Sequence, residues 1–501
     1  MRHRILLAAS LLYLCAANIV WIAIDTRPPF WDMANHARWA MGVLRDFEQN
    51  GIAALQTLPQ DTSGYPPFYH VIVALGYRVF GTSIDTAQLA NIPAMVLLTL
   101  ATYAIARRFI EPTAAAIAGL LVNFFPFMLW ISRETLIEYW LTAMVAVSIW
   151  ALLKTNEFSD TKWSLAFGAL CGLGMLTKWT FVIFVGPPAL WAARKNWGNA
   201  FKAGAVAAIL AAYWYIPRFS TMIAAWRQAA IGGQNEGDPT IFTAQGWLSY
   251  IRALEGSLLF LPLFMAFLAG VLALIRSRRS WTPLALYLFG GWFGLMILPN
   301  HDPRYAAAAL PAVAVITAAA FEKRTVAQIV LVVLLAFQHV LVSFGIPQLP
   351  ERVVLMEGPN GPVRYDWNLY TQSYFGLWGK PEKQDWRIEH VLQVVSTDAS
   401  RPATLGLIPD LPRFDVPAFQ FYIDRDRYPV VIRRQYLPEE ADVRKNDYLL
   451  MSRGEQTAFA SPAPHAYEIN AYILAHPELF RLVETFSLPN GEIIRLYRCV
   501  R

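Results

Sequence analysis

Acidic and basic side chains gather at four points along a chain that is otherwise strongly apolar. In chain order, these side chains are Asp32 with His36, Arg133 with Glu134 and Glu138, Lys178, and Asp302 with Arg304. A carboxylate accepts a proton from an attacking hydroxyl group, and a guanidinium or ammonium group holds an anion such as phosphate. If the fold brings the four points together, these residue types predict an acid–base step beside a bound anion.

Composition places this chemistry at a membrane. Of the 501 residues, 56% are hydrophobic and only 16% are charged, whereas charged residues make up about 25% of a typical soluble protein. The net charge of +6 is spread along the chain, which argues against the clustered Lys and Arg of a nucleic-acid-binding surface. The three cysteines stand in unrelated surroundings, so no disulfide framework is expected.

About eleven apolar stretches are predicted to span the membrane. The first, Ile5–Ile24, follows a basic start and is expected to remain as a span rather than to be cleaved as a signal peptide. The others cover residues 84–106, 113–132, 135–153, 163–177, 179–193, 201–217, 257–275, 282–298, 304–321 and 325–345. With the amino terminus in the cytoplasm, the loops rich in Lys and Arg fall on the cytoplasmic side, as the positive-inside rule requires.

This topology places all four points of chemistry at the outer face. Ionisable groups near a membrane are costly and usually face a cavity or a partner, so their convergence predicts a site. Residues 65–80 are apolar but short, and counting them as a span would invert every later loop. We therefore expect a dipping or juxtamembrane helix there, and a carboxyl terminus outside.

Beyond residue 345, Pro, Asp, Arg and Glu become frequent and no further stretch is long enough to span. Residues 1–345 are predicted to form the transmembrane domain, with a first external loop at 25–65, and residues 346–501 a soluble extracytoplasmic α/β domain. Its expected strands are 403–408, 429–432 and 448–451, its helices 417–423 and 468–474, and its closing hairpin 480–486 with 492–499. The external stretch 218–255 is expected to be a mobile loop over the site.

Three of the candidate side chains have a purely structural alternative. Asp32 follows Pro28-Pro29-Phe30-Trp31 and would act as the cap of a helix that began at Met33. Lys178 and Arg304 would extend to the membrane interface from the ends of their spans without binding anything. These alternatives stay open at the level of sequence.

The remaining candidates are open in the same way. Arg133 and Glu138 would brace one span as an ion pair across roughly one helical turn, and His36 would be an ordinary surface residue. A divalent ion is a further option, because imidazole and carboxylate suit several metals. The residues that would hold such an ion are Asp32, His36, His70 and His301. No tight ligand spacing such as His-x3-His is present, so the sequence does not favour this option.

Five segments resemble a known family. They are the Trp31-Asp32 loop, Tyr65-Pro66-Pro67-Phe68-Tyr69, Ser132-Arg133-x4-Glu138, Leu176-Thr177-Lys178-Trp179 and Asp302-Pro303-Arg304-Tyr305. In their order, spacing and common side, they look like the bacterial relatives of protein O-mannosyltransferases and lipid A aminoarabinose transferases, which are glycosyltransferases of the GT-C superfold. The resemblance covers about residues 1–345.

The resemblance implies an enzyme that moves a sugar from a polyprenyl-phosphate carrier to a protein, lipid or glycan acceptor. It implies a bacterial inner membrane, with the site on the periplasmic or extracellular side. The family's catalytic carboxylate maps onto Asp32, and Glu138 stands where the family often has Asp. The predicted site comprises Asp32, Glu138 and His36 as catalytic residues, Arg304, Lys178 and Arg133 as ligands of the donor phosphate, and Tyr65, Tyr305, Asp302 and Glu134 as further candidates.

Two other classes of protein compete with this interpretation. A secondary transporter is also polytopic, but transporters usually show internal repeats and a binding site near the middle of the bilayer, and neither is visible here. A non-catalytic envelope assembly protein would use the same charged residues as anchors. The sugar and the acceptor depend on pocket shape and are not readable from residue types.

Overall fold

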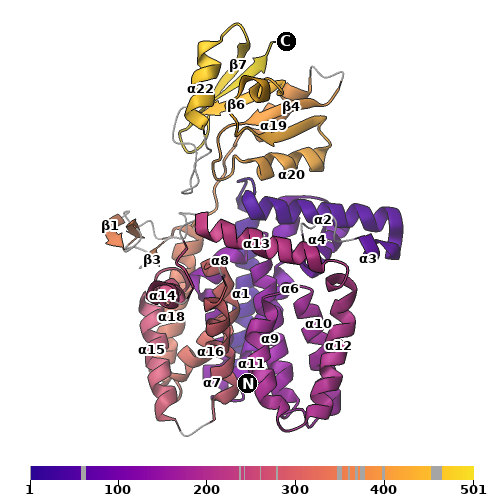
Figure 1. Ribbon diagram of the computed structural model, residues 1–501. Helices are drawn as coiled ribbons and strands as arrows, with labels where there is room; N and C mark the ends of the chain where they lie inside the picture. The colour runs from indigo at the N-terminus through magenta and orange to yellow at the C-terminus, as the bar shows by residue number, and fades with distance from the viewer. Residues whose placement is uncertain are drawn as a thin grey trace.

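The computed structural model describes residues 2–57, 64–235, 238–241, 243–259, 261–277, 280–298, 300–346, 353–358, 361–366, 371–372, 379–397, 401–452 and 465–500 (Figure 1). A bundle of apolar helices carries a layer of helices lying across one end, and a mixed α/β domain lies beyond that layer. In Figure 1 the amino terminus lies at the end of the bundle far from this domain, which holds the carboxyl terminus.

The bundle is built around α9 (Ile137–Lys154), whose side chains are buried along almost its whole length. The other helices of the bundle are α1 (Arg2–Ile24), α5 (Ile84–Leu89), α6 (Ile92–Ala106), α7 (Pro112–Phe124), α8 (Pro126–Ile131), α10 (Thr161–Met175), α11 (Phe181–Ala193), α12 (Trp197–Tyr215), α15 (Leu261–Arg276), α16 (Thr282–Met296), α17 (Leu310–Ala319) and α18 (Thr325–Phe344). Helix α9 packs against α6, α10 and α11. The many alanines of α7 and α17 let neighbouring backbones approach closely.

Each of the eleven predicted stretches contains a helix, but the count of spans is not established. Among the described residues, four helices are long and apolar enough to cross a membrane: His3–Ile24, Ile84–Ala106, Ile137–Lys154 and Thr325–Phe344. A fifth arises if Trp197–Tyr215 and Phe219–Ile231, which meet at 81°, form one broken span. Six further apolar helices are 10–17 residues long. The architecture is thus that of a helical membrane protein.

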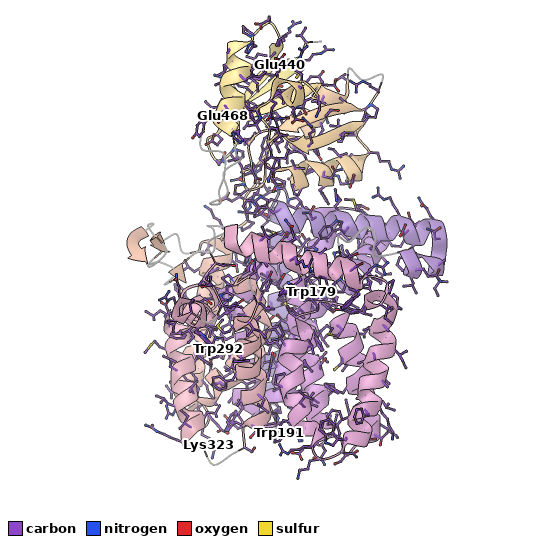
Figure 2. All side chains as sticks on the ribbon, in the orientation of Figure 1. Trp179, Trp191, Trp292, Lys323, Glu440 and Glu468 are labelled. Atoms are coloured by element: carbon purple, nitrogen blue, oxygen red, sulfur yellow. The ribbon has the colours of Figure 1, made fainter. Side chains whose placement is uncertain are left out.

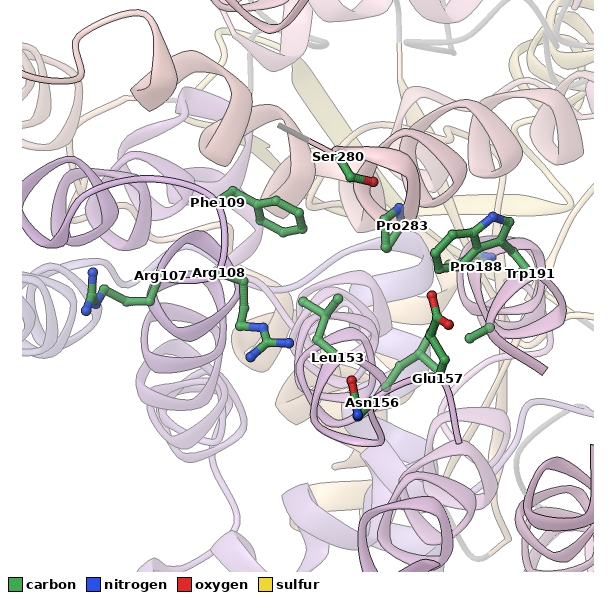
Figure 3. Close-up of a pocket in the computed structure, with 12 residues that line it drawn as sticks. Arg107, Arg108, Phe109, Leu153, Asn156, Glu157, Pro188, Trp191, Ser280 and Pro283 are labelled. Carbon is green, nitrogen blue, oxygen red and sulfur yellow. The ribbon is translucent and has the colours of Figure 1, made fainter. Parts of the chain in front are cut away.

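The basic loops lie together at the end of the bundle far from the α/β domain. A hollow of about 410 Å³ joins the ends of four helix pairs there (Figure 3). Its lining residues include Arg107, Arg108, Asn156, Glu157, Trp191 and Ser280. Figure 2 places Trp191 and Lys323 at this end, opposite the domain that carries Glu440 and Glu468. The loops that the positive-inside rule assigned to one side do share one side.

A layer of helices covers the other end of the bundle. It consists of α2 (Trp31–Asn50), the short turns η1 (Gly51–Ala53) and α3 (Ala54–Thr57), α4 (Phe68–Phe80), α13 (Phe219–Asn235), α14 (Ala244–Ala253) and the π-helical turn η2 (Leu254–Leu258). Helix α4 packs against α2, and the Tyr77 hydroxyl donates a hydrogen bond to the Ala37 carbonyl at 3.2 Å. A short apolar helix therefore occupies most of residues 65–80, where a dipping or juxtamembrane helix was predicted.

The prediction of a mobile loop at residues 218–255 is wrong. Helices α13 and α14 occupy most of this stretch, and the Thr243 side chain caps α14 by accepting from the Gly246 N–H. Apolar residues at helical spacing, among them Phe219, Ile223 and Trp226, outweigh the glycines that suggested a loop. These side chains are half-exposed, so they present an apolar face outward.

The carboxyl-terminal domain holds a five-stranded sheet of order β5-β4-β6-β8-β7. Strands β4 (Ala403–Leu407), β5 (Val430–Arg434) and β6 (Tyr448–Ser452) run parallel, and β7 (Phe480–Ser487) and β8 (Ile493–Cys499) add an antiparallel hairpin. Helices α20 (Val416–Asp426) and α22 (Ala466–Ala475) were predicted, as were all five strands. Elements that were not predicted are α19 (Ile388–Ser396), α21 (Glu440–Val443) and a three-stranded antiparallel sheet of β1 (Val353–Gly358), β2 (Gly361–Asp366) and β3 (Thr371–Gln372).

The carboxyl-terminal domain rests on the outer layer through α20, which packs along α2 (Figure 1). The guanidinium of Arg38 on α2 lies 3.7 Å from the Asp424 carboxylate on α20. Closer to the bundle, the Trp21 indole N–H donates to the Gly379 carbonyl at 3.1 Å. Helix α2, which lies within the first external loop, is therefore held between the outer layer and the domain.

Candidate active site

An ion pair joins the first external loop to the segment before α17. The Arg304 guanidinium donates from Nη1 to Asp32 Oδ2 at 3.0 Å and from Nε to Asp302 Oδ2 at 2.7 Å. Asp302 also caps the 3-10 helix η3 (Pro303–Ala309), because its Oδ1 accepts from the Arg304 N–H. Asp302 thus fixes the direction in which Arg304 points, and Arg304 reaches Asp32 across 272 residues of sequence.

The Asp32 carboxylate is open to solvent, since 46% of its side chain is exposed against 20% for Arg304. Its place in the helix differs from the sequence-based alternative. Helix α2 begins at Trp31 and its cap position is Phe30, so Asp32 lies inside the first turn and is not the cap. A carboxylate in the first turn is stabilised by the helix dipole, and its oxygens remain available to a ligand.

A second ion pair lies beside the first but is buried. Lys178 Nζ donates to Glu138 Oε1 at 2.6 Å, and each side chain is 5% exposed. The same ammonium lies 4.4 Å from the centre of the Tyr305 ring, next in sequence to Arg304. The second oxygen of Glu138, Oε2, is buried without a hydrogen-bond partner among the described residues. Lys178 is therefore held by a carboxylate on α9 and a ring from η3.

Aromatic rings form one wall of the site. The Tyr65 ring stacks on Trp179 at 5.5 Å between centroids, and Figure 2 shows Trp179 at the end of the bundle that faces the outer layer. Burial raises the pKa of the Tyr65 hydroxyl, and the charges of Asp32 and Glu138 raise it further. The two ion pairs are themselves neighbours, because Lys178 contacts Tyr305 and the adjacent residue of η3 is Arg304.

His36 stands behind this wall and is not a surface residue. It is 4% exposed, and its Nδ1 lies 3.1 Å from Nε2 of His70, which is fully buried. The His36 ring also contacts the edge of Tyr65 at 5.1 Å. Burial lowers the pKa of His36 to about 3, and the positive charges of Lys178 and Arg304 act in the same direction. The imidazole is therefore neutral at physiological pH, where it serves as a hydrogen-bonding support.

Two predicted site residues lie elsewhere. Arg133 donates from Nε to Asn18 Oδ1 at 2.9 Å and from Nη2 to Ser343 Oγ at 2.7 Å, and its guanidinium covers the Trp21 ring. It ties α1 and α18 to the turn before α9, and Glu138 pairs with Lys178 instead. The predicted role of Arg133 in phosphate binding and its alternative pairing with Glu138 are both inconsistent with these contacts.

The charges that act on Glu134 come from Arg413, Arg27 and Asp25 and not from the two ion pairs. Glu134 is 4% exposed, and burial raises its pKa to about 7 while the charges of Arg413 and Arg27 lower it. Its backbone carbonyl accepts from the Asn91 side chain at 2.8 Å. Glu134 thus belongs to the contact between the bundle and the domain.

The histidines do not assemble a metal centre with Asp32. His301 donates its backbone N–H to Asp238 Oδ2 at 2.7 Å and lies 3.3 Å from the Ser249 hydroxyl, under α14. Among the residues that the structure describes, no group of three or more His, Cys, Asp or Glu side chains is placed to hold a metal ion. The cations of the two neighbouring ion pairs are Arg304 and Lys178.

Sequence reasoning missed the residues of the carboxyl-terminal domain that reach the first external loop. Asp415 accepts from the Trp31 N–H at 2.8 Å, and Arg413 donates to the Pro28 carbonyl at 2.7 Å. The one signal available was the pattern Asp415-Val416-Pro417, which is typical of a helix start. That pattern says nothing of a second helix 384 residues away.

Comparison with known proteins bears on the helical part first. The family described as dolichyl-phosphate-mannose-protein mannosyltransferase matches residues 65–223, a segment that includes Tyr65, Glu138 and Lys178. An undecaprenyl phosphate-alpha-4-amino-4-deoxy-L-arabinose arabinosyl transferase of Pseudomonas paraeruginosa is 26% identical over 222 residues, which are 41% of this chain. The match spans 38% of that relative's length.

Solved structures resemble the whole chain. ArnT from Cupriavidus metallidurans bound to undecaprenyl phosphate superposes with a TM-score of 0.59 at 14% identity, covering 98% of this chain and 97% of that one. The oligosaccharyltransferase AglB from Archaeoglobus fulgidus, in complex with an inhibitory peptide and a dolichol-phosphate, gives 0.56 at 13% identity, covering 100% and 74%. The chain therefore has the GT-C fold that the five sequence segments implied.

Proposed function

We propose that this GT-C protein is an integral membrane glycosyltransferase that moves a sugar from a polyprenyl-phosphate donor to an acceptor at the extracytoplasmic face. The names of the similar proteins support a lipid-phosphate donor, since they include dolichyl-phosphate mannose, undecaprenyl phosphate and dolichol-phosphate. The acceptor is a protein, a lipid or a glycan. The proposed topology has about eleven spans, with the amino terminus in the cytoplasm and with the site and carboxyl-terminal domain on the periplasmic or extracellular side of a bacterial inner membrane.

The observation that carries the proposal is the contact between Asp32 and Arg304 beside the buried pair of Lys178 and Glu138. One exposed carboxylate and two cations face a common region, at the end of the bundle where the basic loops are not. A phosphate-linked sugar needs these groups, because the phosphate that departs carries negative charge and the attacking group must lose a proton. A transporter site would instead lie near mid-bilayer.

Transfer makes one bond and breaks another. The acceptor hydroxyl oxygen bonds to the anomeric carbon of the donor sugar, and the bond from that carbon to the phosphate oxygen breaks. The phosphate keeps the electron pair of this bond, and the hydroxyl proton moves to a base. Asp32 is the base, because its carboxylate is half-exposed, so that an acceptor reaches it.

Donor binding prepares Asp32 for this role. The donor phosphate competes with the Asp32 carboxylate for the Arg304 guanidinium, which binds phosphate through two parallel hydrogen bonds. Asp302 keeps hold of Arg304 Nε during the exchange. The Asp32 oxygen that accepted from Arg304 is then free to accept from the acceptor hydroxyl. Lys178 adds a second positive charge close by, and Glu138 orients it.

The experiment compares the wild-type chain with Asp32→Asn and with Glu48→Gln, an exposed carboxylate on the same helix. Cells that lack the protein are complemented with each variant, and their envelope lipids, glycans and proteins are analysed by mass spectrometry. We expect the sugar modification that the wild-type chain restores to be lost with Asp32→Asn and kept with Glu48→Gln. Full restoration by Asp32→Asn, at equal protein in the membrane, would refute the catalytic assignment.

A further inference from the structure

The carboxyl-terminal domain contacts the chain segment that leads into α2, the helix that carries Asp32. The segment between β4 and α20 of that domain supplies the contacts. Arg413 is 6% exposed, and besides its bond to the Pro28 carbonyl its guanidinium lies 4.9 Å from the centre of the Phe30 ring. The Trp31 indole N–H reaches Asp410 Oδ1 at 3.4 Å. The residues immediately before Asp32 are therefore bound to the other domain.

Asp415 makes the contact closest to Asp32. Its side chain is fully buried, and its two oxygens serve two helices. Oδ1 accepts from the Ala418 N–H at 2.7 Å and caps α20, whereas Oδ2 accepts from the Trp31 N–H at 2.8 Å at the start of α2. Burial raises the pKa of this carboxyl group to about 7, while the hydrogen bonds from the Ala418 and Trp31 N–H groups lower it. The positive ends of both helix dipoles also converge on Asp415.

Helix α2 has no cap of its own. Phe30 at the cap position provides no side-chain hydrogen bond, and a helix start that is buried without a partner for its N–H groups is costly. Trp31 moreover has φ of 43°, in the left-handed region that a tryptophan rarely adopts. Such a backbone conformation is unfavourable and persists only where the surroundings hold it. The surroundings that hold the Trp31 N–H are supplied by Asp415.

The first turn of α2 also makes two contacts with the helical bundle. The Thr135 hydroxyl donates to the Met33 carbonyl at 2.6 Å, and Arg304 binds the Asp32 carboxylate. The contact with Arg304 is the one that a donor phosphate takes away in the proposed reaction. Once Arg304 has left Asp32, the orientation of the Asp32 side chain depends on the backbone of this turn. That backbone is held by Thr135 from the bundle and by Asp415 from the carboxyl-terminal domain.

We propose that Asp415 is a positioning residue of the active site, through which the carboxyl-terminal domain sets the orientation of Asp32 after the donor has taken Arg304. This inference rests on the proposed function. It gives the domain a role in the transfer step itself, and it makes that step depend on the docking of α20 on α2. Because the Asp415 side chain is fully buried, the donor does not reach it, and the expected effect falls on turnover and not on donor binding.

The variant Asp415→Ser tests this role. A serine at the start of α20 still caps that helix through its own hydroxyl, but it is too short and has too few acceptors to reach Trp31 as well. We expect transfer to fall about 10- to 100-fold, as displacements of about 1 Å in an active site do. We expect binding of undecaprenyl phosphate to the purified protein, measured by native mass spectrometry, to stay within twofold of wild type.

Hydrogen–deuterium exchange gives a readout that does not depend on transfer. In Asp415→Ser, we expect faster exchange in peptides covering residues 28–40 and unchanged exchange in peptides of the five-stranded sheet. The matched control is Asp160→Ser, which changes the cap of α10 in the same way, where Asp160 accepts from the Trp163 N–H at 3.0 Å far from the site. It should leave both transfer and exchange at residues 28–40 as in wild type.

Each outcome decides one claim. Unchanged exchange at residues 28–40 in Asp415→Ser would overturn the coupling of the domain to α2, whatever the chemistry. Faster exchange with full transfer would overturn the positioning role and leave the proposed function intact. The proposed function is tested separately by Asp32→Asn. Full transfer by that variant would refute the proposed function without bearing on the coupling between the domain and α2. If Asp415→Ser does not reach the membrane, Asp415→Asn is measured in its place with the same expectations, because its single side-chain oxygen serves one of the two N–H groups.

Discussion

The two ion pairs of the site share their chemistry and differ in their surroundings. Asp32 with Arg304 is half-exposed on the carboxylate side, whereas Glu138 and Lys178 are each 5% exposed. An exposed ion pair contributes at most about 1 kcal/mol, so it opens easily when another anion arrives. A buried pair that loses one partner leaves an uncompensated charge, which costs about 3–5 kcal/mol. The exposed pair is therefore suited to exchange with substrate, and the buried pair to hold the site together.

The largest effect should come from breaking the buried pair. Glu138→Gln leaves the Lys178 ammonium without its carboxylate, and we expect a loss of about 3–5 kcal/mol of stability, seen as a lower melting temperature of the purified protein. The double variant Glu138→Gln with Lys178→Met removes both charges. It should recover most of that stability without recovering transfer, because the second phosphate cation is gone. A double variant as unstable as Glu138→Gln would contradict a pair that acts as one unit.

The next effect concerns the exposed pair. Arg304→Ala removes the guanidinium that the donor phosphate takes from Asp32, and a charged hydrogen bond of this kind contributes about 1.5–3 kcal/mol. Binding of undecaprenyl phosphate should weaken about 10- to 100-fold, with a change in stability below about 1 kcal/mol. Arg252→Ala on α14, where the side chain is exposed, is the control and should bind as wild type. Equal binding by both variants would remove Arg304 from the phosphate site.

A smaller effect is expected at Asp302. Its carboxylate holds Arg304 Nε at 2.7 Å, while Arg304 uses a different nitrogen, Nη1, for Asp32. Asp302 therefore orients the guanidinium without taking part in the exchange. Asp302→Asn keeps the cap of η3 but weakens the charged bond to Arg304. We expect donor binding to weaken about threefold to tenfold, measured in the same native mass spectrometry assay. A loss as large as that of Arg304→Ala would assign Asp302 a direct contact with substrate.

The sequence predicted the exposed pair better than the buried one. Asp32 and Arg304 were placed on one side by counting Lys and Arg in loops, and the structure brings them within hydrogen-bonding distance. Lys178 and Glu138 were also candidates, but their mutual contact was not foreseen. An ion pair between Glu138 and Arg133 was considered because the two residues are close in sequence. In the packed bundle, Arg133 instead binds Asn18 on α1 and Ser343 on α18. Local spacing does not show which neighbour a side chain faces once helices are packed.

The carboxyl-terminal domain illustrates the same limit from the opposite direction. Its strands were predicted from apolar runs and from the hairpin of β7 and β8, whose turn contains Gly491. These features are local in the sequence. The bond from Trp31 to Asp415 was not, because nothing near either residue records the other. The helices at 218–255 were missed for a third reason, since glycines were weighted above the spacing of Phe219, Ile223 and Trp226. Long-range contacts are the part of a site that a single sequence conceals.

The last expected effect appears only when the pH is lowered, and it comes from His36, the support behind the aromatic wall. The pKa of His36 is lowered to about 3 in the folded protein, whereas an unfolded histidine has a value of about 6.5. As pH falls below about 6.5, the unfolded chain binds a proton at this site that the folded chain does not, so stability decreases with acidity down to about pH 3. Above about pH 7 the site contributes no pH dependence.

His36→Gln should therefore reduce the loss of stability between pH 7 and pH 5, by at most about 2 kcal/mol in the free energy of unfolding. The measurement is the melting temperature as a function of pH, whose slope should be flatter in the variant. His476→Gln, in the carboxyl-terminal domain, should leave the slope as in wild type. A His36→Gln protein with an unchanged slope would mean that the folded protein admits a proton at His36, and the imidazole would then be a candidate for acid–base work beside Asp32 rather than a neutral support.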